Sequence, residues 1–234
     1  MTLESLLPRL KRSLAQSAGT VVFGMEDGTV SIFGLIFGVA ATTSSTVTVL
    51  IAGASGAAAA AVSMMAGAFL DAETSRDARA IEDAHLKQDL ALSPTAMSAV
   101  LPSRLAGAGL QPNLVSALTA AVKDNADAQK GLLTALQADP DKPVGPVEQA
   151  LWMLVADFLS AAIPILPFFL LPIGPARIGS ALVTTALLVA LGIGRAKVAN
   201  RPELRTIGET VAIGVCAALA GVAIGLLLAR IFHA

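Results

Sequence analysis

Five long apolar stretches dominate the chain, at about residues 21–42, 47–70, 149–172, 176–198 and 206–230. A helix rises 1.5 Å per residue, so each stretch is long enough to cross a bilayer core of about 30 Å. The pattern predicts an all-α, polytopic membrane protein with five transmembrane helices per protomer. Residues 21–70 hold helices one and two, and residues 148–234 hold helices three to five.

A polar N-terminal segment precedes these spans. It covers residues 1–20, where five leucines share one helical face and three cations lie elsewhere: Leu3, Leu6, Leu7, Leu10 and Leu14, with Arg9, Lys11 and Arg12. This is the pattern of an amphipathic helix in the membrane interface. An amphipathic helix packed on protein fits the same pattern.

A second polar region, residues 71–147, separates span two from span three and concentrates charge. A helix continuing from span two is expected over 72–91. Turn signals at Ser93-Pro94, between Gly107 and Pro112 and between Asp139 and Pro146 then delimit two or three shorter helices. The region therefore predicts a small helical domain.

Lysines and arginines predict the orientation. Three precede span one, seven lie between spans two and three, and four lie between spans four and five, whereas the other side receives only Arg177 and Arg230. By the positive-inside rule, the N-terminus and residues 71–147 are expected to be cytoplasmic. The sequence does not identify the membrane; in a prokaryote it would be the plasma or inner membrane.

Composition excludes several classes of protein. Hydrophobic residues make up 55% and charged residues 14%, against about 25% charged in soluble domains. A net charge of -1 gives no reason to expect nucleic-acid binding. No nucleophile–base pair, phosphate-binding glycine loop or Cys/His cluster is recognisable, and Cys216 is the single cysteine. We therefore expect neither an enzyme nor an ATP-driven pump, and no tightly bound cofactor.

Two adjacent acids, Glu26 and Asp27, lie inside the first span. An ionised carboxylate in hydrocarbon is costly, so such an acid is a candidate functional residue that should be neutral until a cation binds. Met64 in span two offers a soft thioether, and this oxygen–sulfur combination suits Fe²⁺ better than Na⁺ or K⁺. A structural acid bonded to Ser31 and a gap-filling methionine are the alternatives.

Three sequence runs resemble the vacuolar iron transporter family: EDGTVSIFGLIFGVAA from Glu26, IAGASGAAAAAVSMMAG from Ile51 and AAIPILPF from Ala161. The resemblance implies a homodimer of five-helix protomers that exports Fe²⁺ or Mn²⁺ from the cytosol in exchange for protons. It also implies that Asp27 and Met64 occupy metal-pathway positions.

The chain departs from that family's pattern at two positions. Ala68 stands where the family usually has a glutamate, one residue after Gly67, and Glu26 replaces a neutral amide. Glu26, or Asp71 near the cytoplasmic mouth, is a candidate for restoring the lost charge. The missing ligand leaves open a non-transporting membrane metal sensor or scaffold.

Further candidate metal ligands lie outside spans one and two. Asp157 in span three is a candidate pathway or proton-carrying acid, whereas Glu209 is expected to pair with Arg205 or reach the interface. In the middle domain, Glu82, His85 and Asp89 share one helical face. A Glu-x-x-His pair is typical of carboxylate-bridged metal sites in helical bundles. A solvated polar face is the alternative.

Three glycine pairs recur at four-residue spacing: Gly24/Gly28, Gly34/Gly38 and Gly221/Gly225. Small residues at this spacing let helix backbones approach closely. We therefore expect these faces to form helix contacts, including the contact between protomers, although glycine is common in membrane spans generally.

Overall fold

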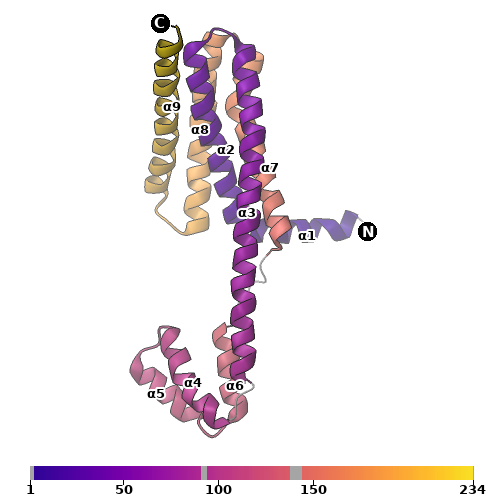
Figure 1. Ribbon diagram of the computed structural model, residues 1–234, viewed down its shortest axis with the longest axis vertical. Coiled ribbons are helices and arrows are strands. Elements are labelled where there is room, and N and C mark those ends of the chain that lie inside the picture. Colours follow the sequence, from indigo (N-terminus) through magenta and orange to yellow (C-terminus); the bar gives the residue numbers. More distant parts are fainter. Residues whose placement is uncertain (1–2, 91–93, 138–143, 234) are drawn as a thin grey trace. The chain divides into compact units, whose positions relative to one another are not determined.

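The computed structural model describes residues 3–90, 94–137 and 144–233, and these residues are predominantly helical (Figure 1). The chain divides into two compact units. Unit 1 comprises Met1–Ala72 and Pro143–Ala234, and unit 2 comprises Glu73–Lys142. The all-α prediction is confirmed.

Five helices are long and apolar enough to cross a membrane. They are α2 (Ala18–Thr42), α3 (Thr46–Leu90), α7 (Pro146–Leu170), α8 (Ile173–Ala199) and α9 (Glu203–His233), with the apolar part of α3 inside Thr46–Glu82. Each agrees with a predicted span to within a few residues, apart from α3, which continues into unit 2. The predicted continuation beyond span two is thus confirmed.

Helix α2 lies at the centre of unit 1 and contacts α7, α8 and α9. It also packs on α3: one hydrophobic cluster contains Ile32 and Ile36 of α2, Val49 of α3 and Phe168 of α7. By contrast, α9 and the membrane part of α3 are largely exposed. These two helices therefore present the faces that lipid or a second protein must cover.

The glycines explain why α2 packs so closely on two neighbours. A Cβ on Gly38 would lie 2.6 Å from the Gly221 carbonyl oxygen of α9, and a Cβ on Gly24 would lie 2.7 Å from the Met153 sulfur of α7. Gly34 makes a similar contact with Ala217. Our expectation that the Gly34/Gly38 face joins two protomers is therefore wrong, because α9 of the same chain occupies it.

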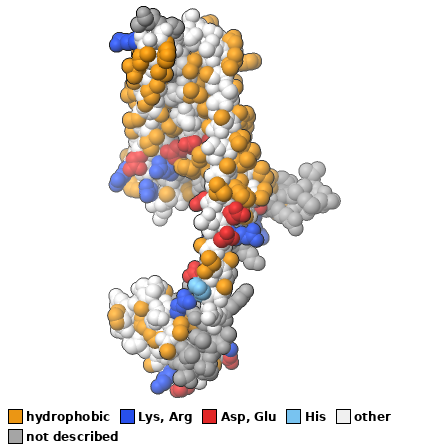
Figure 2. All heavy atoms as spheres, viewed as in Figure 1, with side chains coloured by type: hydrophobic (Ala, Val, Ile, Leu, Met, Phe, Trp, Pro, Cys, Tyr) orange, Lys and Arg blue, Asp and Glu red, His pale blue; other side chains and the backbone are white. Residues whose placement is uncertain are grey.

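Helices α2, α7 and α9 run in one direction, and α3 and α8 run in the other. Charged side chains gather at the end of unit 1 where α9 begins, and hydrophobic atoms cover most of the visible bundle (Figure 2). At the opposite end, the Arg177 guanidinium of α8 donates to the carbonyl oxygens of Ala40 and Thr43. It thereby satisfies carbonyls that the end of α2 leaves unpaired.

The N-terminal helix α1 (Leu3–Gln16) precedes α2 and is joined to α7 by a side-chain hydrogen bond. The Trp152 indole nitrogen donates to the buried Ser13 hydroxyl at 2.8 Å. Leu10 and Leu14 remain exposed. The C-terminal part of the leucine face is thus exposed on the described part of this protomer, and the interfacial position of this helix stays a prediction; the side chains of Leu3, Leu6 and Leu7 lie outside the described residues.

Unit 2 contains the end of α3 and three short helices, α4 (Pro94–Gly107), α5 (Pro112–Val122) and α6 (Ala126–Gln137). Its core joins Leu101 and Leu105 of α4 to Leu133 of α6. Gly109 ends α4 in a left-handed conformation with φ of 83°, as is common after a helix. The predicted turn between Gly107 and Pro112 is confirmed, since it separates α4 from α5, whereas the break between α5 and α6 was not predicted. The other two predicted turns lie partly outside the described residues.

Candidate metal-binding site

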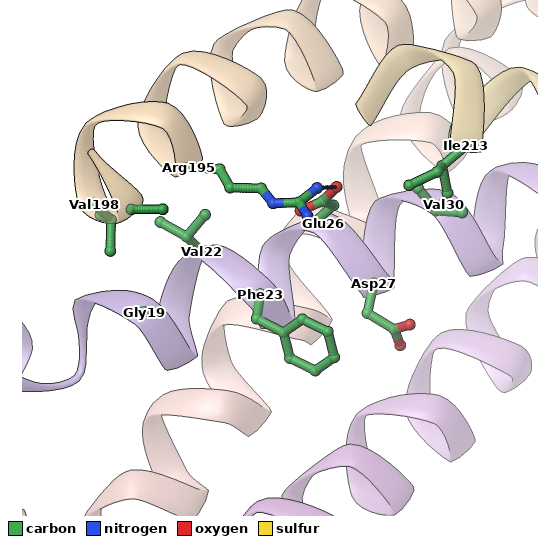
Figure 3. Close-up of a pocket in the computed structure, with 10 residues that line it drawn as sticks. Gly19, Val22, Phe23, Glu26, Asp27, Val30, Arg195, Val198 and Ile213 are labelled. Carbon is green, nitrogen blue, oxygen red and sulfur yellow. Dashed lines mark hydrogen bonds and ion pairs between the residues drawn. The ribbon is translucent and has the colours of Figure 1, made fainter. Parts of the chain in front are cut away.

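The two adjacent acids of α2 project in different directions. Glu26 turns toward α8 and α9, whereas Phe23 and Asp27 point away from Arg195 (Figure 3). Neighbouring residues of a helix differ by about 100° around its axis. The sequence therefore places two carboxylates at nearly the same depth, but their side chains point to different sides of α2.

Glu26 belongs to a polar contact that joins three helices. Its Oε1 atom accepts from the Arg195 guanidinium of α8 at 3.1 Å and from the Thr210 hydroxyl of α9 at 3.0 Å. The side chains of Glu26 and Arg195 are 12% and 33% exposed. The carboxylate is thus paired with a cation of its own chain.

A cavity of about 400 Å³ lies beside this ion pair and is lined by α2, α8 and α9. Both acids and Arg195 line it, and the rest of its wall is apolar: Gly19, Val22, Phe23, Val30, Val198, Ala199 and Ile213. The cavity therefore lies beside both acids between mostly hydrophobic walls.

Asp27 has no hydrogen-bond partner among the residues that the structure describes. It is half-buried, and on the same side of α2 Phe23 and Ser31, one turn before and after it, are exposed. Nine residues separate Asp27 from the start of α2, about 13 Å along the helix. An acid at this depth, next to an open helix face, is available to a ligand or a second protein.

Asp157 of α7 is wholly buried against α2. Its residue is 0% exposed, and neither carboxylate oxygen has a hydrogen-bond partner among the described residues. The Ser160 hydroxyl donates to the main-chain carbonyl of Asp157, not to its carboxylate. Helix α2 meets α7 at this point, because a Cβ on Gly28, the residue after Asp27, would collide with the main-chain carbonyl of Asp157.

Met64 lies on α3 at the same depth as Asp27. A Cβ on Gly53 would lie 3.0 Å from the Ile36 side chain. Gly53 of α3 and Ile36 of α2 therefore lie at about the same height along these two antiparallel helices. Met64 follows Gly53 by about 16 Å along its helix, and Asp27 precedes Ile36 by about 13 Å. The carboxylate and the thioether therefore lie within about one turn of each other along the bundle.

A known protein family matches most of this chain. The sequence matches the profile described as VIT family over residues 18–226, which includes α2, α3, α7 and α8 and most of α9. The chain belongs to the VIT family. The resemblance that we noted in its sequence is thus confirmed, and the chain is an integral membrane protein.

Three curated relatives of this VIT-family chain carry similar names. "Vacuolar iron transporter 1" of Arabidopsis thaliana is 27% identical over 203 residues, covering 86% of this chain and 81% of that protein. "Vacuolar iron transporter" of Centaurea cyanus is 26% identical, covering 86% and 83%. "Vacuolar iron transporter 1" of Tulipa gesneriana is 26% identical, covering 87% and 83%. The matched lengths include both units.

The remaining predicted ligands of the VIT-family chain are exposed where the structure describes their side chains. Asp71 is exposed at the end of unit 1, and Glu82 and His85 are exposed in unit 2. The side chain of Asp89 lies outside the described residues. Within the described part, no group of three or more His, Cys, Asp or Glu side chains could hold a metal ion. The middle-domain site therefore stays a prediction.

Sequence reasoning missed the roles of Arg195 and Thr210. Their contacts with Glu26 span 169 and 184 residues of sequence, so no local spacing signals them. From the sequence alone, Arg195 is only one of the cations that predict the cytoplasmic side. Glu209, by contrast, pairs with Arg205 at 2.9 Å, and this predicted pairing is confirmed.

Proposed function

We propose that this VIT-family protein is a secondary transporter that exports divalent metal, Fe²⁺ and also Mn²⁺, from the cytosol in exchange for protons. Membership of the family and the names of its relatives support metal transport. The observation that carries the mechanism is Asp27, an acid without a partner among the described residues, deep in an apolar helix. Such acids mark ion and proton pathways in membrane proteins.

Asp27 and Met64 form the metal pathway in this proposal. The carboxylate takes up the metal and releases its proton, and the thioether adds a soft ligand that favours Fe²⁺ over harder cations. Asp71 attracts cations at the cytoplasmic mouth. Glu26 holds Arg195 and Thr210, so we assign it to the support of α2 instead of the metal.

The functional unit in this proposal is a homodimer. Asp27 lies beside the exposed Phe23 and Ser31, and a charge facing lipid is expensive. The neighbouring α3 exposes small residues over several turns, including Ser55, Ala58 and Ala66. Small residues favour close contact between membrane helices. A second copy packed on these faces would remove Asp27 from lipid and bring two pathways together.

Transport by reconstituted protein tests the proposal. Proteoliposomes containing a pH-sensitive dye are supplied in turn with Fe²⁺, Mn²⁺, Co²⁺ and Zn²⁺. We expect Fe²⁺ and Mn²⁺ to move with opposite proton flow, and Asp27→Asn, which keeps the shape but removes the charge, to abolish both movements. Met64→Leu should retain some flux and shift preference toward Mn²⁺. Transport at the parent rate by Asp27→Asn would refute the mechanism.

The absence of the usual glutamate at Ala68 favours the second candidate, a membrane metal sensor or scaffold without transport. Ala68 is 9% exposed, so the small side chain is also part of the packing of α3. The same liposomes separate the two functions. A protein that binds metal and forms dimers but moves neither metal nor protons is the sensor or scaffold.

A further inference from the structure

The burial of Asp157 is unusual for a carboxylic acid. The residue is 0% exposed, and both of its carboxylate oxygens lack a hydrogen-bond partner among the described residues. Burying an acid without a partner costs free energy, and native proteins seldom leave such groups unpaired. A bound ion would satisfy the carboxylate oxygens of such an acid.

The packing of α2 against α7 places a second acid, Asp27, on the helix that covers Asp157. Gly28 has no Cβ, and a side chain there would collide with the main-chain carbonyl of Asp157. The backbone of α2 therefore passes directly over Asp157, and the residue before Gly28 is Asp27. Two carboxylates on helices in such close contact repel each other when both are ionised, unless a cation or a proton lies between them.

We infer that Asp27 and Asp157 together bind one divalent cation inside a single protomer, with Asp157 as the inner ligand. The inference rests on the proposed function, since it treats Asp27 as a metal ligand, and it adds a second site residue from α7. Two carboxylates neutralise a divalent charge. Asp157 would thus supply the negative charge that Ala68 does not provide.

A thioether lies next to this pair. Met153 is one turn before Asp157 on the same face of α7, is 4% exposed, and has its sulfur against Gly24 of α2. Two oxygens and one sulfur make a mixed set of hard and soft donors, which suits borderline metals such as Fe²⁺ and Co²⁺. Met153 and Asp157 lie at the α2–α7 contact and Asp27 lies on the adjoining turn of α2, so all three donors would come from one protomer.

Equilibrium binding of Mn²⁺ to the full-length protein in lipid nanodiscs tests the inference, with free Mn²⁺ measured by electron paramagnetic resonance. We expect Asp157→Asn and Asp27→Asn each to weaken binding at least tenfold. Both side chains would hold the same ion, so their effects should not multiply. The fold-loss of Mn²⁺ affinity in the double variant should be much smaller than the product of the fold-losses in the two single variants. Glu209→Gln, which removes an exposed carboxylate paired with Arg205, is the matched control and should bind like the parent.

Parent affinity in Asp157→Asn would overturn the inference, as would a parent protein that binds no Mn²⁺. A second measurement avoids dependence on the folding of the variant. Dicyclohexylcarbodiimide labels protonated carboxyl groups in apolar surroundings, and mass spectrometry locates the label. In the parent protein, saturating Mn²⁺ should slow labelling of Asp157 at least fivefold. Equal labelling with and without Mn²⁺ would also overturn the inference.

These outcomes are distinct from those for transport. A parent protein that binds Mn²⁺ through both acids but moves no metal keeps the paired site and rejects the transporter. Loss of transport in Asp27→Asn, together with parent affinity in Asp157→Asn, keeps the transporter and rejects the paired site.

Discussion

At the scale of single residues, neighbours in sequence have different roles. Glu26 and Asp27 are both acids in one apolar helix, yet Glu26 accepts two hydrogen bonds from α8 and α9, while Asp27 has no such partner in the described part of the chain. A buried ion pair is most costly when one member is removed, because the other charge remains unpaired. We therefore expect Glu26 to affect stability and Asp27 to affect metal binding.

Substitution of the ion pair tests this division. Glu26→Gln leaves Arg195 without its carboxylate and should lower stability by about 2 kcal/mol, seen as a lower melting temperature in detergent. The double variant Glu26→Gln/Arg195→Gln removes both charges and should recover part of the loss. Mn²⁺ affinity should stay at the parent value in Glu26→Gln. A loss of affinity as large as that of Asp27→Asn would instead make Glu26 a metal ligand.

At the scale of helices, glycine spacing predicted close approach but not the partner. The Gly34/Gly38 and Gly221/Gly225 pairs meet each other within one protomer, and Gly24/Gly28 meets α7. Four-residue spacing defines a small face on each helix, and any two such faces are compatible. The sequence could therefore predict that α2 packs tightly, whereas the choice between its own chain and a second copy depends on the whole bundle.

Two glycines of α9 offer a matched comparison. A Cβ at Gly221 would collide with the Gly34 carbonyl of α2, and a Cβ at Gly208 would meet nothing within 4 Å. Gly221→Ala should therefore cost about 1–3 kcal/mol through overpacking, and Gly208→Ala should be neutral or stabilise by up to about 1 kcal/mol. Thermal unfolding of the purified variants measures both. Equal melting temperatures would show that α9 does not pack on α2 in this way.

At the scale of the whole molecule, the hydrophobic pattern was sufficient for the fold. Membrane spans must bury their backbone polar groups within the helix, so length and apolarity alone identify them. The candidate site was predictable only in part. Asp27 and Asp157 are conspicuous as acids inside apolar runs, but the contacts of Glu26 and the meeting of Asp157 with Gly28 depend on helix rotation and on residues more than 120 apart in sequence. Neither follows from local spacing.

Orientation remains a prediction of charge alone, and it determines the direction of transport. Fourteen cations fall on the side of the N-terminus and residues 71–147, against two on the other side, so the former side should be cytoplasmic. Cys216→Ser removes the single cysteine and provides a background for Ser44→Cys, in the exposed connection between α2 and α3, and for Ser103→Cys, exposed in unit 2. In intact cells whose plasma membrane contains the protein, an impermeant maleimide should label Ser44→Cys directly and Ser103→Cys only after permeabilisation. The reverse result would place Asp71 and the beginning of α2 on the outer side, and metal moving from that side through the protein would be imported instead of exported.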